Sequence, residues 1–369
     1  MKKQVGILTF HSSNNFGALL QTYGTFFIVD KLGETPSIIN YHCPHKKNGY
    51  KAFYWSKDRT LKKNLIAIAN APLKHSKNRK SESFRQDTLN IKTKELTTYE
   101  EMRTEQNKYL KIIVGSDQIW NYLNTGFDKR YFLDFVEEPN KKIAYAASFA
   151  ISNIEEKYKK DYANLLNQIS YISVREEQGC KIVQELTGKD VPQTLDPTFL
   201  LTKEEWNSFA ISESTKTIGN DYLLIYSIGN DKRTIKLARK IATELNLKII
   251  IIGNRFQEYL MSGVKTVNPS IHEFVKLFRD ASYIVTSSFH GVAFSAIFNK
   301  EFICSLDRDS PGNSRQLSLL EMIGLSNRIA YNSMDSQQVN VEIDWDNVNK
   351  ILEYEREKSV KFLKNALSG

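Results

Sequence analysis

The chain has few cysteines, scattered histidines and none of the spacings that hold a metal ion. Its three cysteines, Cys43, Cys180 and Cys304, lie far apart, and an odd number cannot pair completely. They form neither a CxxC pair nor a zinc-ligand spacing, so the sequence predicts no disulfide framework and no metal site. This cysteine usage favours a reducing cytoplasm.

Long apolar runs are also missing. No window approaches the ~20 apolar residues of a membrane-spanning helix. The first apolar run is too short for a secretory signal and is interrupted at Asn14 and Asn15. We therefore expect a cytoplasmic protein, soluble or peripheral. The chain also lacks the GxGxxG fingerprint of dinucleotide-binding folds and any internal repeat.

Acidic residues are nearly absent from one segment. Between His42 and Arg85 there are twelve Lys and Arg but only two acids, Asp58 and Glu82, which gives a net charge of +10. The whole chain carries +9, so the remainder is close to neutral. A uniformly basic protein would suggest nucleic acid, whereas a basic segment on a neutral body indicates a local anionic partner. We therefore expect no nucleic-acid partner.

An apolar stripe lies inside this basic segment. One face of a helix here would carry four apolar residues beside Lys62 and Lys63, namely Leu61, Leu65, Ile68 and Ala69. Such a helix suits peripheral contact with an anionic membrane, on the inner face of the cell membrane. A solvated basic arm with a packed apolar face is the other interpretation, and the sequence leaves both open.

Strand and helix patterns alternate in both halves of the chain. Short runs rich in β-branched residues predict strands, and apolar residues at helical spacing predict helices. The expected strands span 3–10, 36–40, 110–114, 142–146, 171–174 and 193–195, then 222–227, 248–252, 264–267, 283–286 and 301–305. The expected helices span 18–32, 153–167, a segment from 177, 233–245, 270–281 and 345–367. This alternation predicts an α/β fold of two Rossmann-like domains with parallel sheets, facing a cleft.

The same pattern suggests where the domains begin and end. Residues 1–200 form an N-terminal α/β domain, with a basic insertion at about 42–85. A polar linker at 201–220 precedes a C-terminal α/β domain at 221–344, and a long amphipathic helix at 345–369 closes the chain. Ligands bind beyond the carboxyl ends of the strands in such sheets. Polar residues that follow strands are therefore the candidate site residues.

The most informative candidate is the turn after the strand at 283–286. It carries Ser287, Ser288, His290 and Gly291 before an apolar helix. A helix N-terminus offers free N–H groups and partial positive charge to an anion. An imidazole with an ordinary pKa of roughly 6.5 can move protons there. His290 is therefore the candidate general acid and base, although a histidine that only caps the turn is the simpler structural interpretation.

Two further candidates in the first half suit anion binding. The polar turn from His11 joins the first strand to the first helix and offers Asn14, Asn15 and Gly17 to a phosphate. An ordinary helix cap would explain Asn15 alone. Arg175 follows another strand, and its planar guanidinium matches a carboxylate or phosphate with two parallel bonds.

A third set suits a sugar. Ser116, Asp117 and Gln118 follow the strand at 110–114 and offer a hydroxyl, a carboxylate and an amide, so we expect them to face the cleft. We expect Trp120, two residues on, to be a core residue. Asp196 precedes a proline, where an aspartate commonly caps a turn.

Five ordered motifs resemble those of the polysaccharide pyruvyltransferases. They are NNFG at 14–17, GSDQIW at 115–120, SVRE at 173–176, LDPT at 195–198 and TSSFHG at 286–291. Each motif alone is weak, but the ordered set is specific and covers roughly residues 4 to 330. The resemblance implies a two-domain fold similar to GT-B glycosyltransferases, with residues 1–200 on the acceptor side and residues 221–344 on the donor side.

The resemblance also implies an activity. Members of the family transfer the pyruvyl group of phosphoenolpyruvate to two hydroxyls of a sugar as a ketal. Phosphoenolpyruvate is then a substrate, no cofactor is implied, and the acceptor belongs to an exopolysaccharide, a capsule or a lipid-linked glycan precursor. The family's essential histidine corresponds to His290 and its important arginine to Arg175. Some members have a basic residue at the position of Ser288, and Arg315 is the candidate that supplies this charge here.

Two other functions stay open. A GT-B-like glycosyltransferase would use a nucleotide sugar and would need a base-stacking aromatic and a ribose-binding glutamate, for which Glu273 is a candidate. A non-catalytic glycan-assembly protein would have kept only the fold.

Overall fold

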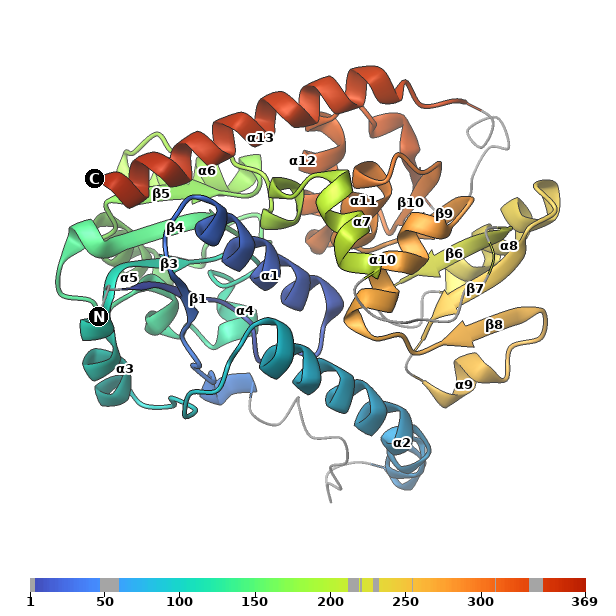
Figure 1. Ribbon diagram of the computed structural model, residues 1–369, viewed down its shortest axis with the longest axis horizontal. Helices are drawn as coiled ribbons and strands as arrows, with labels where there is room; N and C mark the ends of the chain where they lie inside the picture. The colour runs from blue at the N-terminus through green and yellow to red at the C-terminus, as the bar shows by residue number, and fades with distance from the viewer. Residues whose placement is uncertain are drawn as a thin grey trace. The chain divides into compact units, whose positions relative to one another are not determined.

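Two units, each built on one parallel sheet, make up the structure (Figure 1). The computed structural model describes residues 4–46, 60–211, 219, 221–227, 232–253, 255–308, 310–331 and 341–369. Unit 1 takes its described residues from 1–49, 85–201 and 350–369, and unit 2 takes its own from 50–84 and 202–349. The predicted α/β class with two parallel sheets is confirmed.

Unit 1 has a five-stranded sheet in the order β2-β1-β3-β4-β5. Its strands are β1 (Gln4–Leu8), β2 (Pro36–Ile38), β3 (Tyr109–Val114), β4 (Lys142–Ala147) and β5 (Tyr171–Val174). Its helices are α1 (Phe16–Lys31), α3 (Tyr99–Glu105), α4 (Tyr122–Thr125), α5 (Glu156–Asn167) and α6 (Glu177–Thr187). Strand β4 is buried throughout and β3 is buried over its last three residues, as expected for strands covered on both faces.

Unit 2 has a six-stranded sheet in the order β11-β10-β9-β6-β7-β8. The strands are β6 (Tyr222–Tyr226), β7 (Lys248–Ile252), β8 (Val264–Val267), β9 (Tyr283–Thr286), β10 (Phe302–Leu306) and β11 (Ile329–Tyr331). The helices are α2 (Leu61–Ser83), α7 (Lys203–Ile211), α8 (Lys232–Glu244), α9 (Phe256–Tyr259), α10 (Ile271–Asp280), α11 (Phe289–Ile297) and α12 (Ser314–Met322). Strand order therefore places the carboxyl ends of β6, β9 and β10 side by side.

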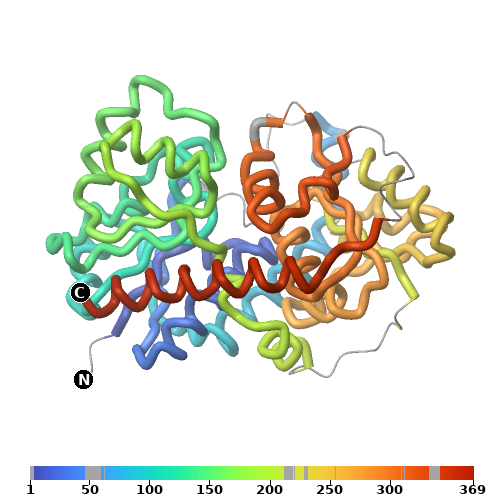
Figure 2. The backbone as a smooth tube through the Cα atoms, turned by 90° about the horizontal axis from the view of Figure 1, so that it is seen from above, coloured from blue at the N-terminus to red at the C-terminus, as the bar shows by residue number. Residues whose placement is uncertain are grey.

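The last helix, α13 (Trp345–Ser368), ends on unit 1. Its Ser359 Oγ accepts a hydrogen bond from Leu195 N at 3.0 Å, and its Phe362 ring lies 6.3 Å from the Tyr145 ring. Figure 2 shows α13 (red) as one continuous helix. The predicted helix at 345–367 is confirmed in position. It is not a separate part of the chain, because residues 350–369 belong to unit 1.

Three other segments differ from the expectation. The predicted linker contains helix α7, whose Trp206 is fully buried against Phe294 at a ring distance of 5.1 Å. The predicted strand at 193–195 makes only an isolated bridge, because Gln193 alone pairs with Val174. Of the basic segment, residues 47–59 lie outside the described residues, whereas 60–84 group with unit 2.

No helix among the described residues combines the length and hydropathy that crossing a membrane requires. The C-terminal half of α2 rests on unit 2 through Lys80, which donates to Asn268 O at 2.5 Å.

Candidate functional site

Unit 1 carries its polar residues at the carboxyl edge of the sheet, with Arg175 at the centre. Arg175 follows β5, and its Nη1 donates to Asp196 Oδ2 at 2.6 Å. Asp117 Oδ1 lies 3.7 Å from Nη2 of the same guanidinium. The side chains of Arg175 and Asp196 are 1% and 0% exposed. Burial opposes the charge of Arg175, but Asp196, Asp117 and Glu176 outweigh it and raise the pKa of the guanidinium.

This geometry changes the expectation for Arg175 and extends the one for Asp196. Arg175 is already bound to a carboxylate and is buried, so the predicted direct contact between Arg175 and a bound anion does not fit this arrangement. Asp196 does cap a turn, since its Oδ1 accepts from Thr198 N at 3.0 Å. It is also the main partner of Arg175, a pairing that the sequence did not indicate because the two residues lie 21 positions apart.

Ser116 belongs to the same buried network. Its Oγ donates to Ala146 O at 2.7 Å and lies 3.3 Å from Asp196 Oδ2. Its backbone N–H donates to Gln21 Oε1 at 3.1 Å, and Gln21 in turn donates to Thr9 Oγ1 at 2.7 Å. We expected Ser116 to face the cleft, but the residue is fully buried, and its hydroxyl joins the end of β3 to the Asp196 turn.

Asp117 and Gln118 reach the surface only in part. Asp117 adopts a left-handed backbone with φ 72°, and its Oδ1 accepts from Gln118 N at 2.8 Å. Gln118 Oε1 accepts from Asn124 Nδ2 at 2.6 Å. Trp120 is fully buried and donates its indole N–H to Tyr131 O at 2.9 Å, so its prediction as a core residue is confirmed. Asp117 and Gln118 remain the candidates here for contact with a ligand.

The Asn14–Gly17 turn opens helix α1. Asn15 is exposed, and its Oδ1 accepts from Ala18 N at 3.3 Å, which is the ordinary helix cap. Asn14 Oδ1 accepts from both terminal nitrogens of Arg85 at 3.2 Å. Gly17 is buried. Arg85 therefore adds a cation to this helix N-terminus, and sequence reading missed it because it lies 71 positions from Asn14.

A pair of histidines stands beside this turn. His11 is fully buried, and its Nε2 lies 3.0 Å from Asn40 Oδ1. His42 Nε2 lies 3.0 Å from the same oxygen. Burial lowers the pKa of His11 to about 4, against the smaller opposing effect of the Asn40 bond. His11 is therefore neutral at pH 7 and acts as a structural link between β1 and β2.

Unit 2 presents the strand–turn–helix motif that the sequence indicated. Strand β9 ends at Thr286, whose Oγ1 donates to Tyr226 O at 2.6 Å and accepts from Ser288 N at 3.0 Å. Helix α11 starts at once, and a Cβ on Gly291 would lie 1.9 Å from Thr286 Oγ1. Only glycine fits this close approach of helix to strand.

His290 lies in the first turn of α11 and is 6% exposed. Its ring lies 5.2 Å from that of Phe289, edge to face. Ser288, the helix N-cap, is buried and makes no side-chain cap bond. Ser287 is partly exposed, and its hydroxyl lies 3.1 Å from that of Ser227. The Ser287 hydroxyl is therefore the partly exposed group of this motif, and the nearly buried His290 follows it by three residues.

A hollow of about 600 Å³ lies beyond the carboxyl ends of β9 and β10. Ser287 and Gln316 line it, and Gln316 Nε2 donates to Ser287 O at 3.1 Å. The buried Gln316 Oε1 has no hydrogen-bond partner among the described residues. The hollow also holds the predicted Arg315, together with two cations and one carboxylate that sequence reading did not single out: Lys232, Arg233 and Asp307.

The charges of this hollow favour an anion. Arg233 Nη2 and Asp307 Oδ2 lie 2.9 Å apart, so one cation is largely neutralised within the site. Lys232 and Arg315 also line the hollow, so its lining carries three cations and one carboxylate. Among the described residues, no group of three or more His, Cys, Asp or Glu is arranged to hold a metal ion.

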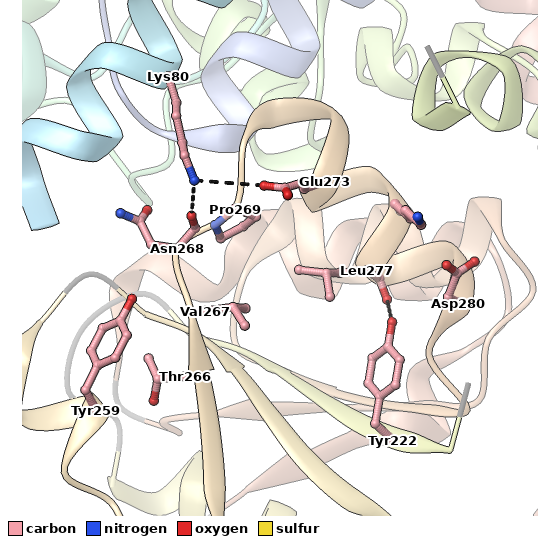
Figure 3. A pocket seen from close by; sticks show the side chains of 11 residues that line it. Lys80, Tyr222, Tyr259, Thr266, Val267, Asn268, Pro269, Glu273, Leu277 and Asp280 are labelled. Carbon is pink, nitrogen blue, oxygen red and sulfur yellow. Dashed lines mark hydrogen bonds and ion pairs between the residues drawn. The ribbon is translucent and has the colours of Figure 1, made fainter. Parts of the chain in front are cut away.

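A second hollow, of about 280 Å³, runs along α10 (Figure 3). Tyr259 and Glu273 both line it, the two residue types that a nucleotide sugar would require. However, Glu273 Oε2 accepts from Ser270 N at 2.7 Å in a capping box and lies 3.9 Å from Lys80 Nζ. Glu273 thus has a structural role at the start of α10, which weakens the glycosyltransferase interpretation.

Comparison with known proteins supports the fold and the family. No curated protein matches the chain. Among solved structures, the UDP-N-acetylglucosamine 2-epimerase of Rickettsia bellii is 11% identical with a TM-score of 0.51, covering 100% of this chain and 97% of its own. The corresponding epimerase of Methanocaldococcus jannaschii is 13% identical with a TM-score of 0.49, covering 96% and 92%. The similarity to the Rickettsia bellii epimerase shows that this chain has a fold of the GT-B type.

The family comparison is more specific. The model of the polysaccharide pyruvyl transferase family matches residues 15–310. That range includes every motif on which the resemblance rested except Asn14, and it reaches from the N-cap of α1 into the hollow beyond β10. The chain belongs to the polysaccharide pyruvyl transferase family and is a transferase.

Proposed function

We propose that the protein transfers the pyruvyl group of phosphoenolpyruvate to two hydroxyls of a sugar in a glycan precursor. The observation that carries the proposal is the cationic hollow of unit 2, beside the motif of His290. Phosphoenolpyruvate carries a phosphate and a carboxylate, and the hollow offers Lys232 and Arg315 as partners for two anionic groups. We propose that this reaction takes place in the cytoplasm.

The reaction balances without water or a cofactor. Two sugar hydroxyls add to C2 of phosphoenolpyruvate, the C2–O bond to phosphate breaks, and C3 gains one proton. The hydroxyls release two protons, of which one reaches C3 and the other leaves with the phosphate. We propose His290 as the group that moves these protons, since an imidazole serves as both acid and base near neutral pH.

The sugar is proposed to contact unit 1. Asn15, Asp117 and Gln118 offer polar groups at the carboxyl edge of that sheet, and Arg175 holds Asp117 and Asp196 in place. Arg175 is thus proposed as a positioning residue.

The test is turnover with defined substrates. The purified chain is incubated with phosphoenolpyruvate and a panel of p-nitrophenyl and lipid-linked sugars, and both phosphate release and the mass of a pyruvyl ketal are measured. His290→Ala should lower turnover by roughly 10²–10⁴-fold. Arg315→Gln should raise KM for phosphoenolpyruvate by roughly 10–100-fold, the effect of one charged hydrogen bond. His75→Ala, an exposed histidine on α2, is the control and should change neither value.

Other outcomes would point elsewhere. Turnover of a nucleotide sugar without phosphoenolpyruvate would favour the glycosyltransferase interpretation. An unchanged rate for His290→Ala would remove that residue from the mechanism, and no turnover with any acceptor would leave the non-catalytic interpretation.

A further inference from the structure

Helix α2 exposes an apolar stripe on a strongly basic segment. Among the described residues, fourteen large apolar side chains are exposed, and four of them lie within eight consecutive positions of α2. Single exposed apolar residues need no explanation, whereas a cluster marks an interaction surface. Leu61, Leu65 and Ile68 are 67%, 56% and 47% exposed and share one helical face. We call these three residues the α2 stripe.

The three side chains of the stripe stay exposed although Asn64 on its flank is buried, and a hydrogen bond that joins α2 to the rest of unit 2 lies on the opposite side of the helix. Asn70 Oδ1 accepts from Phe256 N at 2.7 Å and so joins α2 to α9. Asn70 follows Leu61 by nine residues, which is two and a half turns at about 3.6 residues per turn. It therefore lies on the side of the helix opposite Leu61. Figure 1 shows α2 beside α9.

The charge around the stripe decides between possible partners. Helix α2 carries six Lys and Arg and one acid, Glu82, which gives +5, and residues 42–85 together carry +10. A second copy of the chain would bring an equal positive charge to the stripe, which disfavours self-association. A nucleic acid would leave the leucines without an apolar partner. An anionic lipid surface satisfies both features, since it offers phosphate groups above an acyl layer.

We propose that the α2 stripe docks this protein on an anionic membrane surface. The helix lies in the headgroup plane, with Leu61, Leu65 and Ile68 in the acyl boundary and the lysines against the phosphates. The stripe spans about 10 Å of helix, at about 1.5 Å per residue, which suits shallow and reversible binding. The inference stands without the proposed reaction, because it depends only on the surface of unit 2.

The test is co-sedimentation of the full chain with vesicles. One set contains phosphatidylglycerol and phosphatidylcholine, and the other phosphatidylcholine alone. The protein should sediment with the first set only, and less as salt rises. The double variant Leu65→Ser, Ile68→Ser should bind at least about tenfold more weakly, the loss expected for removing apolar area from the acyl boundary. Leu123→Ser on α4, a leucine 65% exposed in unit 1, is the matched control and should bind like the wild type.

A second variant tests the charge separately. Lys62→Gln with Lys63→Gln should weaken binding by roughly 25-fold, which is about fivefold for each basic residue near an anionic surface. Circular dichroism checks that each variant is folded, and turnover with a soluble acceptor should be unchanged in both. Three results would overturn the proposal: no sedimentation of the wild type at low salt, equal binding by the Leu65→Ser, Ile68→Ser variant, or a wild-type dimer that this variant dissociates.

Discussion

The buried ion pair between Arg175 and Asp196 should be the most sensitive point of unit 1. The two side chains are 1% and 0% exposed, and Nη1 and Oδ2 lie 2.6 Å apart. Replacing one partner leaves the other charge buried without its counter-charge. Arg175→Met or Asp196→Asn should therefore lower the free energy of unfolding by about 3–5 kcal/mol. A pair on the surface is worth only about 0–1 kcal/mol.

The assay is thermal and urea unfolding of the two single variants and of the double variant. For a unit of this size, about 3–5 kcal/mol corresponds to a midpoint lower by about 6–20 °C. The double variant removes both charges, so its cost should fall below the sum of the single costs by about 2–3 kcal/mol. This difference separates the charge interaction from the loss of two side chains.

The exposed pair Arg103–Glu137 is a matched control in the same unit. Its nitrogen–oxygen distance is 2.9 Å, and its side chains are 54% and 68% exposed. Arg103→Met should therefore cost no more than about 1 kcal/mol. The reasoning is refuted if Arg175→Met costs as little as this control, or if the double variant costs the full sum of the two single variants.

Two further predictions concern local packing and pH. Gly291→Ala should destabilise unit 2 by about 1–3 kcal/mol, because its Cβ would lie 1.9 Å from Thr286 Oγ1, whereas Gly312→Ala meets no such atom and should be neutral in thermal unfolding. His11 is neutral in the folded state down to about pH 4, while the unfolded chain takes up the proton near pH 6.5. The unfolded state thus binds more protons between these values, so stability should fall by roughly 3 kcal/mol as pH drops from 6.5 to 4, and His11→Asn should flatten this slope in urea titrations. An equal pH slope in the variant would contradict the assignment.

Local sequence patterns predicted most of the strands and helices. Strands β5, β7 and β8 begin and end at the predicted residues, because short runs of Ile and Val bounded by polar residues are a local signal. The same signal indicated the site turns, since a polar residue directly after a buried strand lies at the ligand-binding edge wherever that strand sits. His290 and Gly291 were found in this way.

Pairings over long distances along the chain were decided by tertiary structure. Thr9 and Ser116 meet across 107 positions because β1 and β3 are neighbours in the sheet, and strand order is not a local property. The same holds for Arg85, which meets the Asn14 turn only because 85–201 folds with the first strands. That residue 116 is a polar serine did not by itself indicate whether its side chain would be buried or exposed.

The sequence by itself determined the α/β class, the family motifs and the excess positive charge of residues 42–85. Periodicity, turn chemistry and composition are local properties that can be read from the order of residues alone. Only the tertiary structure decided that Arg175 is held by Asp196, that Lys232 and Arg315 share one hollow, and that α2 exposes its leucines. These results depend on which surfaces are buried when the sheets form, and burial is a property of the packed chain as a whole.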